Sequence, residues 1–299
     1  MTRTIGRAIL AGAALSAIGA VPGFAAPQRW PLAITTEPAA DRAHPARIEV
    51  LRIPSGDATM NGIAYVPAGV GPHPLFVLLH GLPGNERNFD LAQTLRRAGW
   101  TVVMVHYRGA WGSQGRFSFQ HCLEDARATL AYVRDPATAA KLGADPKRVV
   151  LGGHSMGGWV TAMTLADDTG LLGGVIISAG DFGAIGARAR TARAQVVASM
   201  DDNRAPLAGV TGETMADELA ANADRWTFAG LAPKLRDRRL HVMWSDDFVA
   251  EDSRRLLAAV RAPGGKRITE DHVATDHVWS DKRLTLQALT LKWLATLPQ

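Results

Sequence analysis

The chain has 299 residues, of which 47% are hydrophobic and 20% are charged, a composition that excludes a disordered or low-complexity polymer. This length is enough for one large α/β domain or for two small domains. Lys and Arg total 33 against 28 Asp and Glu, but the cations neither form a run nor alternate with aromatic residues, so we expect no nucleic-acid partner.

Residues 1–25 predict a cleavable signal peptide. Two arginines precede an apolar run, and the small residues Gly23 and Ala25 stand at the spacing that a signal peptidase site needs. We therefore expect cleavage between Ala25 and Ala26 and a secreted or periplasmic protein, with no stable membrane insertion after leader removal. An uncleaved anchor is the alternative, although glycines and a proline interrupt a run shorter than the roughly 20 residues that a spanning helix needs.

The rest of the chain predicts an arm over 26–45 and one domain over 46–299. In this domain strand patterns alternate with helix patterns, which predicts a mostly parallel sheet of about eight strands with helices on both faces. The periodicity does not give the order of the strands. The expected strands are 47–53, 60–66, 75–79, 102–105, 149–151, 175–177, 240–244 and 267–273. The expected helices are 88–98, 119–133, 156–166, 252–260 and 284–294.

One interval, residues 183–239, breaks this alternation, and we refer to it as the lid segment. It contains two helical patterns, 184–200 and 213–226. Connections between strands and helices are normally a few residues long, so a segment of this size predicts a small helical lid. A cluster of arginines on such a segment is usually solvated, although any of them could meet an anionic substrate. These arginines are Arg188, Arg190, Arg193, Arg204 and Arg225.

A serine flanked by glycines follows the strand at 149–151 and precedes a helix. The pattern from Gly153 to Gly157, with Ser155 at its centre, fits a sharp strand-to-helix turn that holds the serine in a strained backbone conformation. Side chains at either glycine would collide with the neighbouring backbone. Ser155 would lie at a helix N-terminus, where free amides favour developing negative charge, so we expect it to be a nucleophile. An ordinary glycine-rich turn is the alternative.

A nucleophilic serine needs a base and a group that orients the base. His277 follows the last expected strand in a loop, whereas His272 lies inside that strand, so His277 is the expected base and His272 the alternative. The strand at 240–244 is followed by Asp246 and Asp247, and both are possible as the acid.

The loop after the strand at 75–79 predicts the second donor of an oxyanion hole. Gly81 lets the backbone approach the site, so the amide of Leu82 can point at the same oxygen as the amide of Met156. We expect no metal and no organic cofactor, because zinc-type ligand spacing and a dinucleotide fingerprint are both missing from the sequence. The single cysteine, Cys122, also excludes an intramolecular disulfide.

Together these motifs resemble the α/β-hydrolase superfamily, and within it the prolyl-oligopeptidase-like, serine-aminopeptidase-like and dienelactone-hydrolase-like group. The run 79–84 is similar to the oxyanion loop, 153–157 to the nucleophile turn and 276–277 to the histidine loop. The resemblance covers residue 46 to the C-terminus and implies the chain order Ser155, acid, His277. It also implies Asp247 as the acid, because this residue lies two positions before Val249 near a strand end. Asp246 stays open as the alternative.

The sequence therefore predicts a serine hydrolase with the α/β-hydrolase fold. The expected substrate is a small-molecule ester or a short peptide, whose bond is cleaved through an acyl-serine intermediate. Ester hydrolysis is our first choice and an exopeptidase is the alternative. From another class, a non-catalytic binding protein on the same fold is the rival. The oligomeric state is not encoded in any pattern that we identify.

Overall fold

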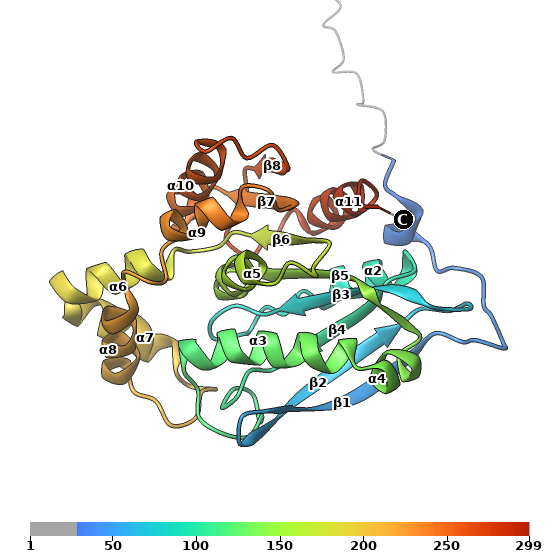
Figure 1. Cartoon of the computed structure of the whole chain (residues 1–299), viewed down its shortest axis with the longest axis horizontal. Coiled ribbons are helices and arrows are strands. Elements are labelled where there is room, and N and C mark those ends of the chain that lie inside the picture. The colour runs from blue at the N-terminus through green and yellow to red at the C-terminus, as the bar shows by residue number, and fades with distance from the viewer. Residues whose placement is uncertain (1–28, 299) are drawn as a thin grey trace, which may run out of the picture.

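Continuous apolar runs form the strands of the central sheet. Within residues 29–298, which a computed structural model describes, eight strands form one sheet in the order β1-β2-β4-β3-β5-β6-β7-β8 (Figure 1). The pairs β1–β2 and β2–β4 are antiparallel, and the remaining pairs are parallel. The strands are β1 (Arg47–Ser55), β2 (Ala58–Val66), β3 (His73–Leu79), β4 (Thr101–Val105), β5 (Ala144–His154), β6 (Gly173–Ile177), β7 (Leu240–Ser245) and β8 (Ile268–Val273).

Helices cover both faces of the sheet, which confirms the expected α/β architecture. All residues of β4 and β6 are buried, as expected for strands that are packed on both sides. One face packs against α3 (Phe119–Arg134), α5 (Met156–Asp167) and α10 (Ala250–Arg261). The other face packs against α2 (Phe89–Arg97) and α11 (Arg283–Leu294).

Two short helices were not expected. The first, α1 (Leu32–Thr35), lies in the expected arm and packs against α2, where Arg97 Nε donates a 2.5 Å hydrogen bond to the carbonyl oxygen of Ala33. The second, α4 (Pro136–Lys141), follows α3 after Asp135, whose side chain accepts a hydrogen bond from the Thr138 amide. Both are too short to show a helical period in the sequence.

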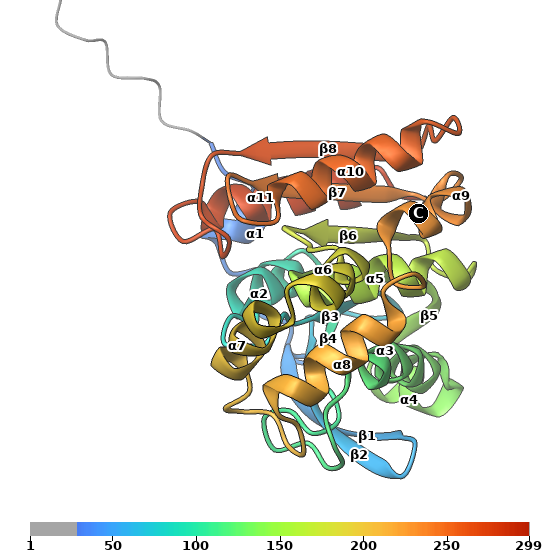
Figure 2. The same ribbon diagram turned by 90° about the vertical axis from the view of Figure 1, so that its left-hand side faces the viewer.

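The lid segment contains four helices, so the expectation of two is wrong. They are α6 (Phe182–Thr191), α7 (Arg193–Asn203), α8 (Gly212–Asn222) and α9 (Phe228–Leu235). The expected helix over 184–200 breaks at Ala192, which has φ −135° and ψ 48°. The break turns the chain so that α6 and α7 both pack on α8, and this tertiary contact outweighs the helical pattern that runs through Ala192. Figure 1 shows α6, α7 and α8 together at the left-hand end of the molecule, and Figure 2 shows the same three helices with this end facing the viewer.

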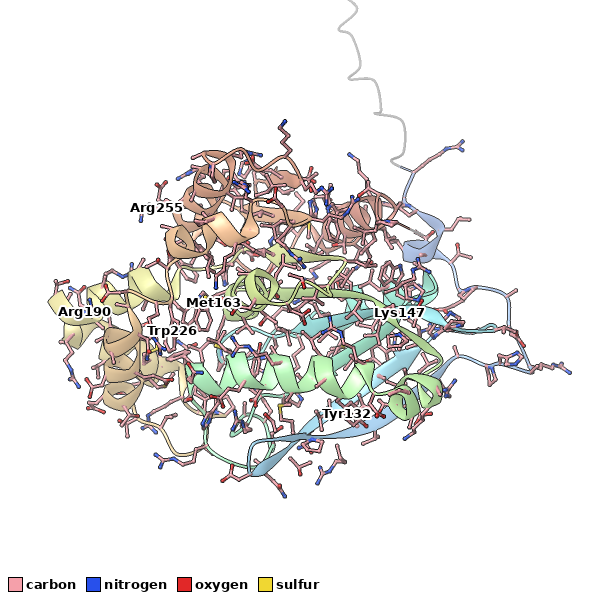
Figure 3. The ribbon with its side chains drawn as sticks, viewed as in Figure 1. Tyr132, Lys147, Met163, Arg190, Trp226 and Arg255 are labelled. Carbon is pink, nitrogen blue, oxygen red and sulfur yellow. The ribbon has the colours of Figure 1, made fainter. Side chains whose placement is uncertain are left out.

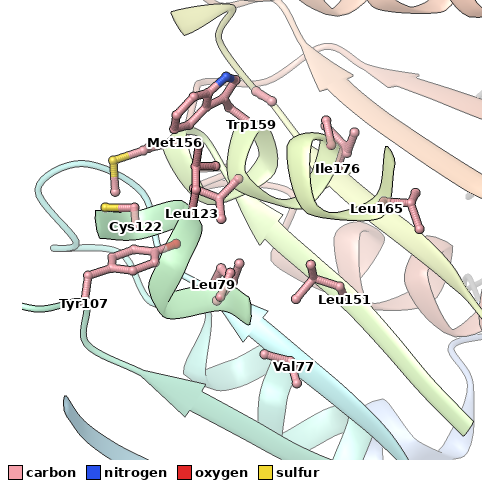
Figure 4. Close-up of a cluster of buried hydrophobic side chains, with 14 of the residues drawn as sticks. Val77, Leu79, Tyr107, Cys122, Leu123, Leu151, Met156, Trp159, Leu165 and Ile176 are labelled. Atoms are coloured by element: carbon pink, nitrogen blue, oxygen red, sulfur yellow. The ribbon is translucent and has the colours of Figure 1, made fainter. Parts of the chain in front are cut away.

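The core between the sheet and the α3–α5 face is continuous and apolar. Leu79 and Leu151 from the sheet meet Leu123 and Trp159 from the helices (Figure 4). Cys122 is fully buried in the same cluster. Burial of each large apolar side chain contributes roughly 1.5–3 kcal/mol to the free energy of folding.

Aromatic contacts join the lid segment to this core. The rings of Trp159 and Phe182 stack with centroids 4.7 Å apart, and Trp159 Nε1 donates a 3.1 Å hydrogen bond to the carbonyl oxygen of Trp226. Trp226 lies where the lid segment meets the body of the protein (Figure 3). The start of α6 and the residues before α9 are therefore held on α5.

Two sequence expectations concern the chain termini and membranes. The expected leader, residues 1–25, lies outside the described residues, and the division of the chain into leader, arm and domain stays a prediction. In the part of the chain that the structure describes, we find no helix with the length and apolar character needed to cross a membrane.

Candidate active site

The turn between β5 and α5 holds Ser155 in a strained conformation. Its φ of 55° lies in the left-handed region, which non-glycine residues rarely adopt. Its amide donates a 2.9 Å hydrogen bond to the carbonyl oxygen of Ile177 in β6. A Cβ atom on Gly153 would lie 2.3 Å from the Gly157 carbonyl oxygen, and one on Gly157 would lie 2.3 Å from the Leu79 carbonyl oxygen. Both glycines are therefore required by the close approach of β5, α5 and β3.

Three side chains predicted from separate parts of the sequence meet at this turn. His277, in the loop between β8 and α11, places Nε2 3.0 Å from Ser155 Oγ. Its other nitrogen, Nδ1, lies 2.8 Å from Oδ2 of Asp247, which follows β7. With the ring proton on Nδ1, the imidazole donates to the carboxylate and accepts the serine hydroxyl proton at Nε2. The fold thus brings a hydroxyl, an imidazole and a carboxylate into one hydrogen-bonded chain.

The environment of Asp247 keeps this carboxylate ionised. Burial raises its pKa, but hydrogen bonds from His277, from Ser245 Oγ at 2.8 Å and from the Val249 amide at 2.9 Å outweigh this effect. The pKa of Asp247 is therefore held below its usual value. Its side chain is 3% exposed, so its charge faces the imidazole in a site with little competing water.

The alternative acid and base form a separate pair at the surface. His272 Nε2 lies 2.7 Å from Asp246 Oδ1, and both side chains are exposed. The His272 ring stacks on Trp244 with centroids 4.0 Å apart. The structure therefore brings these two residues to each other, and their hydrogen bond does not involve Ser155.

The expected oxyanion donors lie on the two segments that flank Ser155. Leu82 lies in the loop after β3, and this loop approaches the nucleophile so closely that a Cβ on Gly81 would lie 2.9 Å from Ser155 Cβ. Met156 is the first residue of α5, where amides have no partner within the helix. Within residues 29–298 neither amide has a hydrogen-bond acceptor in the protein. Both are free to bind a developing oxyanion.

His80 fixes the loop that carries Leu82. Its ring is buried, and burial lowers its pKa to about 3, so the imidazole is neutral near pH 7. Nδ1 lies 2.8 Å from the Gly81 carbonyl oxygen and donates to it. On the other side of the loop, Trp111 Nε1 donates a 2.7 Å hydrogen bond to the Pro83 carbonyl oxygen. The loop is thus held from two sides.

Comparison with known proteins identifies the family of this chain. The model of the alpha/beta hydrolase family matches residues 76–288. The chain belongs to this family. The resemblance seen in the sequence motifs is therefore confirmed.

Individual relatives of this hydrolase are distant. It is 31% identical over 123 residues to the quorum-quenching protein AidA of Acinetobacter baumannii (strain MDR-ZJ06), and the match covers 39% of each chain. An esterase of Pyrococcus furiosus shares 15% identity at a TM-score of 0.61, covering 84% of this chain and 91% of that chain. A carboxylesterase from a metagenomic library shares 19% identity at a TM-score of 0.62, covering 89% and 92%.

A further solved structure is a peptidase. The acylaminoacyl peptidase of Pyrococcus horikoshii shares 14% identity at a TM-score of 0.61, and the match covers 84% of this hydrolase but 41% of the peptidase chain. At these identities the structural likeness establishes the fold alone.

Sequence reasoning missed a set of residues that hold the histidine loop and the acid. His154 Nε2 lies 2.7 Å from the His277 carbonyl oxygen, and the two rings are 4.7 Å apart. A second chain of hydrogen bonds runs from Trp279 Nε1 to Ser178 Oγ at 3.1 Å and from Ser178 Oγ to Ser245 Oγ at 2.9 Å. Ser245 then donates to Asp247. Their shared signal in the sequence is a position at a strand end or in the histidine loop.

A cavity of about 470 Å³ opens beside Ser155 and His277 in the hydrolase. The lid segment and the residue before it contribute four apolar side chains, namely Phe182, Ile185, Val196 and Met200. The same stretch contributes four polar side chains, namely Arg188, Gln195, Ser199 and Asn203. Phe248 lies at the mouth, 81% exposed, with its ring centroid 4.5 Å from that of His277. The cavity can accept a largely apolar substrate that also carries a polar group.

No metal site competes with this interpretation in residues 29–298, where three or more candidate ligands do not cluster.

Proposed function

We propose that this hydrolase cleaves carboxylic ester bonds through an acyl-serine intermediate on Ser155. The observation that carries the proposal is the continuous chain of hydrogen bonds from Ser155 through His277 to Asp247, at 3.0 Å and 2.8 Å. A serine becomes a nucleophile when a base takes its proton and a third group holds the base in place. These contacts supply both conditions.

The reaction follows from the position of the groups. Ser155 Oγ forms a bond to the acyl carbon while its proton moves to His277 Nε2. The carbonyl electron pair moves onto the oxygen, which accepts hydrogen bonds from the amides of Leu82 and Met156. Asp247 stabilises the imidazolium. When the intermediate collapses, the bond to the alcohol oxygen breaks and this oxygen takes the proton from Nε2. Water then repeats the same steps on the acyl-serine and releases the acid.

Electrostatic stabilisation of the oxyanion supplies much of the expected rate. The N-terminus of α5 directs its free amides and the positive end of its dipole toward Ser155. Loss of one such donor costs about 10²–10³ in kcat in related acyl-transfer sites. The same donors would serve an amide substrate, so they do not decide between ester and peptide.

The cavity wall favours an ester over the free N-terminus of a peptide. Among the described residues that line it, none is Asp or Glu, so the α-ammonium of an aminopeptidase substrate would meet no counter-charge. Cleavage of an ester also depends less on proton donation by His277, because an alcohol is a better leaving group than an amine.

A fluorophosphonate label tests the nucleophile directly. We expect the native protein to be labelled and Ser155→Ala to lose both labelling and hydrolysis of p-nitrophenyl acetate. Ser280→Ala, which alters an exposed serine three residues after His277, is the control and should keep both. Circular dichroism shows whether each variant is folded. Labelling that persists in a folded Ser155→Ala variant would place the nucleophile elsewhere and refute the proposal.

A further inference from the structure

We infer that the substrate carries a carboxylate and that Arg188 of the lid segment binds it. The inference rests on the proposed function, since it assumes that Ser155 acts on an acyl group in the adjoining cavity. It concerns a different property, the charge of the substrate at a distance from the reacting bond. The carboxylate can belong to the acyl part or to the alcohol part of the ester, and the experiment below separates the two.

Arg188 is the charged side chain of the cavity wall. Apart from His277, the described residues that line the cavity are apolar, glycine or uncharged polar residues, and Lys, Asp and Glu are missing from them. A single guanidinium in such a wall is a recognition group for an anion, because it presents several donors that match the geometry of a carboxylate. With a neutral substrate, the guanidinium would be hydrated by water and would add nothing to binding.

Four of the five arginines named in the sequence analysis already have partners. Arg190 pairs with Asp224 at 3.0 Å, at the outer edge of the segment (Figure 3). Arg193 pairs with Asp217 and Arg204 with Asp201, each at 2.8 Å, and Arg225 donates to the side chain of Asn222. The guanidinium of Arg188 makes no hydrogen bond or ion pair with any described residue. Of the five arginines, the one at the cavity is thus the one without a partner.

The position of Arg188 on α6 explains how it reaches the cavity. Phe182, Ile185 and Arg188 are spaced by three residues, which places them along one side of the helix, and all three line the cavity. A different side of α6 packs on α8, where a Cβ on Gly186 would lie 2.2 Å from the Leu219 carbonyl oxygen. This close packing fixes the rotation of α6 and therefore the side on which Arg188 lies. Arg188 itself is exposed, as a residue at a cavity mouth would be.

A buried carboxylate, Asp181, and a half-buried one, Asp252, lie near the cavity, but neither contacts the Arg188 guanidinium. The Asp181 carboxylate accepts hydrogen bonds from the amides of Gly183, Ala184 and Phe228. Asp252 accepts one from the Asp181 amide at 3.0 Å. Neither carboxylate is part of the cavity wall. Burial raises the pKa of Asp252, and the charge of Arg188 is among the groups that oppose this rise. The charge of Arg188 therefore acts on Asp252 from a distance, and neither carboxylate forms an ion pair with the guanidinium.

The other side chains of the cavity wall indicate the chemistry of the rest of the substrate. Ile185, Val196 and Met200 offer apolar contact next to Arg188, and Phe248 does so next to His277. An apolar segment of the substrate would lie along these side chains, with the reacting carbonyl at Ser155 and the carboxylate at Arg188. The chemical class that fits is an ester with an apolar chain and one carboxylate, such as a half-ester of a dicarboxylic acid.

Two matched pairs of esters test the inference. p-Nitrophenyl hydrogen glutarate and p-nitrophenyl pentanoate have acyl chains of the same length, and only the first has a carboxylate there. 4-Acetoxybenzoate and phenyl acetate differ in the same way on the alcohol side. Each ester is assayed with native protein, Arg188→Gln, Arg188→Lys and the control Arg193→Gln. Arg193 is an arginine of the same segment that is paired with Asp217 and does not line the cavity.

We expect Arg188→Gln to lower kcat/KM about tenfold on one anionic ester and to change it by less than about twofold on the matched neutral ester. The loss should lie in KM rather than kcat, because the carboxylate is bound equally in the ground state and the transition state. Arg188→Lys should restore part of the loss, and added salt should reduce the difference. The pair that responds identifies the part of the ester that carries the carboxylate.

Equal losses on the anionic and the neutral ester of both pairs would overturn the inference, as would an equal effect of Arg193→Gln. These results are distinct from a failure of the proposed function. If hydrolysis of neutral esters depends on Ser155 but no variant of Arg188 separates the pairs, only the substrate inference fails. If hydrolysis survives in Ser155→Ala, the proposed function fails first.

Discussion

His154 holds the histidine loop in place but has no part in the proposed proton transfer. His154 is 4% exposed, and its pKa is lowered from 6.5 to about 3. Burial is the larger cause, and the charge of His277 lowers the pKa further. The ring is therefore neutral in the folded protein, and its Nε2 donates a 2.7 Å hydrogen bond to the His277 carbonyl oxygen. Protonation of this ring would place a buried positive charge next to His277, the proposed base.

This burial predicts a loss of stability at acidic pH. The unfolded chain binds a proton at His154 below its usual pKa of 6.5, whereas the native protein binds it only near pH 3. Since the unfolded state then holds more protons, the free energy of unfolding falls as the pH drops through this window. His154→Gln keeps an amide donor and removes the titration. We expect it to reduce the slope of this free energy between about pH 4 and 6 by up to about 1.4 kcal/mol per pH unit.

Urea denaturation at several pH values measures this slope. Thr35→Ala changes an exposed side chain that carries no titrating group and is the control, which should leave the slope as it is in the native protein. Burial also lowers the pKa values of the buried His80 and His241 and of the half-buried His106, so part of the slope should remain in His154→Gln. An unchanged slope in His154→Gln would contradict the assignment of a buried neutral ring.

At the scale of single residues, the sequence predicted the groups that have a local pattern. Ser155 stands between glycines whose need is set by backbone contacts at the turn itself, and His277 follows a strand end. Ser178 and Ser245 also lie at strand ends, but no motif around them shows that their side chains meet. They meet because β6 and β7 are neighbours in the sheet, and this pairing depends on tertiary structure. The choice of Asp247 over Asp246 likewise depended on a family resemblance.

At the scale of elements, one carboxylate connects the lid segment to the body. Asp181 caps the N-terminus of α6 by accepting from the Gly183 and Ala184 amides, and it also accepts from Phe228 at the start of α9. Asp181 thus fixes the two ends of the lid segment to each other. The α6 side chains that line the cavity depend on this connection for their positions.

Asp181→Ala should therefore affect both stability and substrate binding. Loss of a helix cap costs about 1 kcal/mol of unfolding free energy, and the freed amide of Phe228 adds to this cost. We expect a higher KM for esters with long acyl chains, whereas fluorophosphonate labelling of Ser155 continues because the proposed triad lies outside the lid segment. Urea denaturation and ester kinetics measure the two effects.

Asp135→Ala is the matched control, since Asp135 also caps a helix but α4 lies away from the cavity. It should lose about 1 kcal/mol of stability, the cost of a helix cap alone, and keep the KM of the native protein. A KM that rises equally in both variants would show that the effect comes from general destabilisation and not from the lid segment.

The end of α6 is an element boundary that helical periodicity in the sequence does not predict. The run of Ala and Arg through Ala192 is a good helix former, yet the helix ends there because α6 and α7 each pack on α8. The close approach of α6 to α8 is possible at Gly186, where any side chain would collide with the Leu219 carbonyl. A glycine inside a helical pattern was the available signal for this packing.

At the scale of the whole molecule, the sheet order brings the distant parts of the site together. β3 pairs with β5 in a register that sets Leu79 beside Gly153, so the loop carrying Leu82 follows directly beside the turn of Ser155. Strand patterns predicted that these strands exist but not which of them are neighbours, because a buried apolar strand fits equally well at several positions in a sheet.

Export of the protein is the remaining prediction at this scale. Residues 1–25 lie outside the described residues, and the expectation rests on the small residues Gly23 and Ala25 before the proposed cleavage site. We expect the protein isolated from the periplasm of a bacterial host to begin at Ala26. Ala25→Arg should block processing, because the site accepts only small side chains, and should leave the uncleaved chain in the membrane fraction.

Intact mass and cell fractionation measure this outcome. Ala39→Arg introduces the same charge at an exposed position of the arm and should be processed normally. A native chain that keeps residues 1–25 and remains in the cytoplasm would contradict export. Folding itself should not depend on the compartment, because the single cysteine is buried in the core and forms no disulfide. Activity measured before and after export should therefore differ only if residues 1–25 interfere with the cavity.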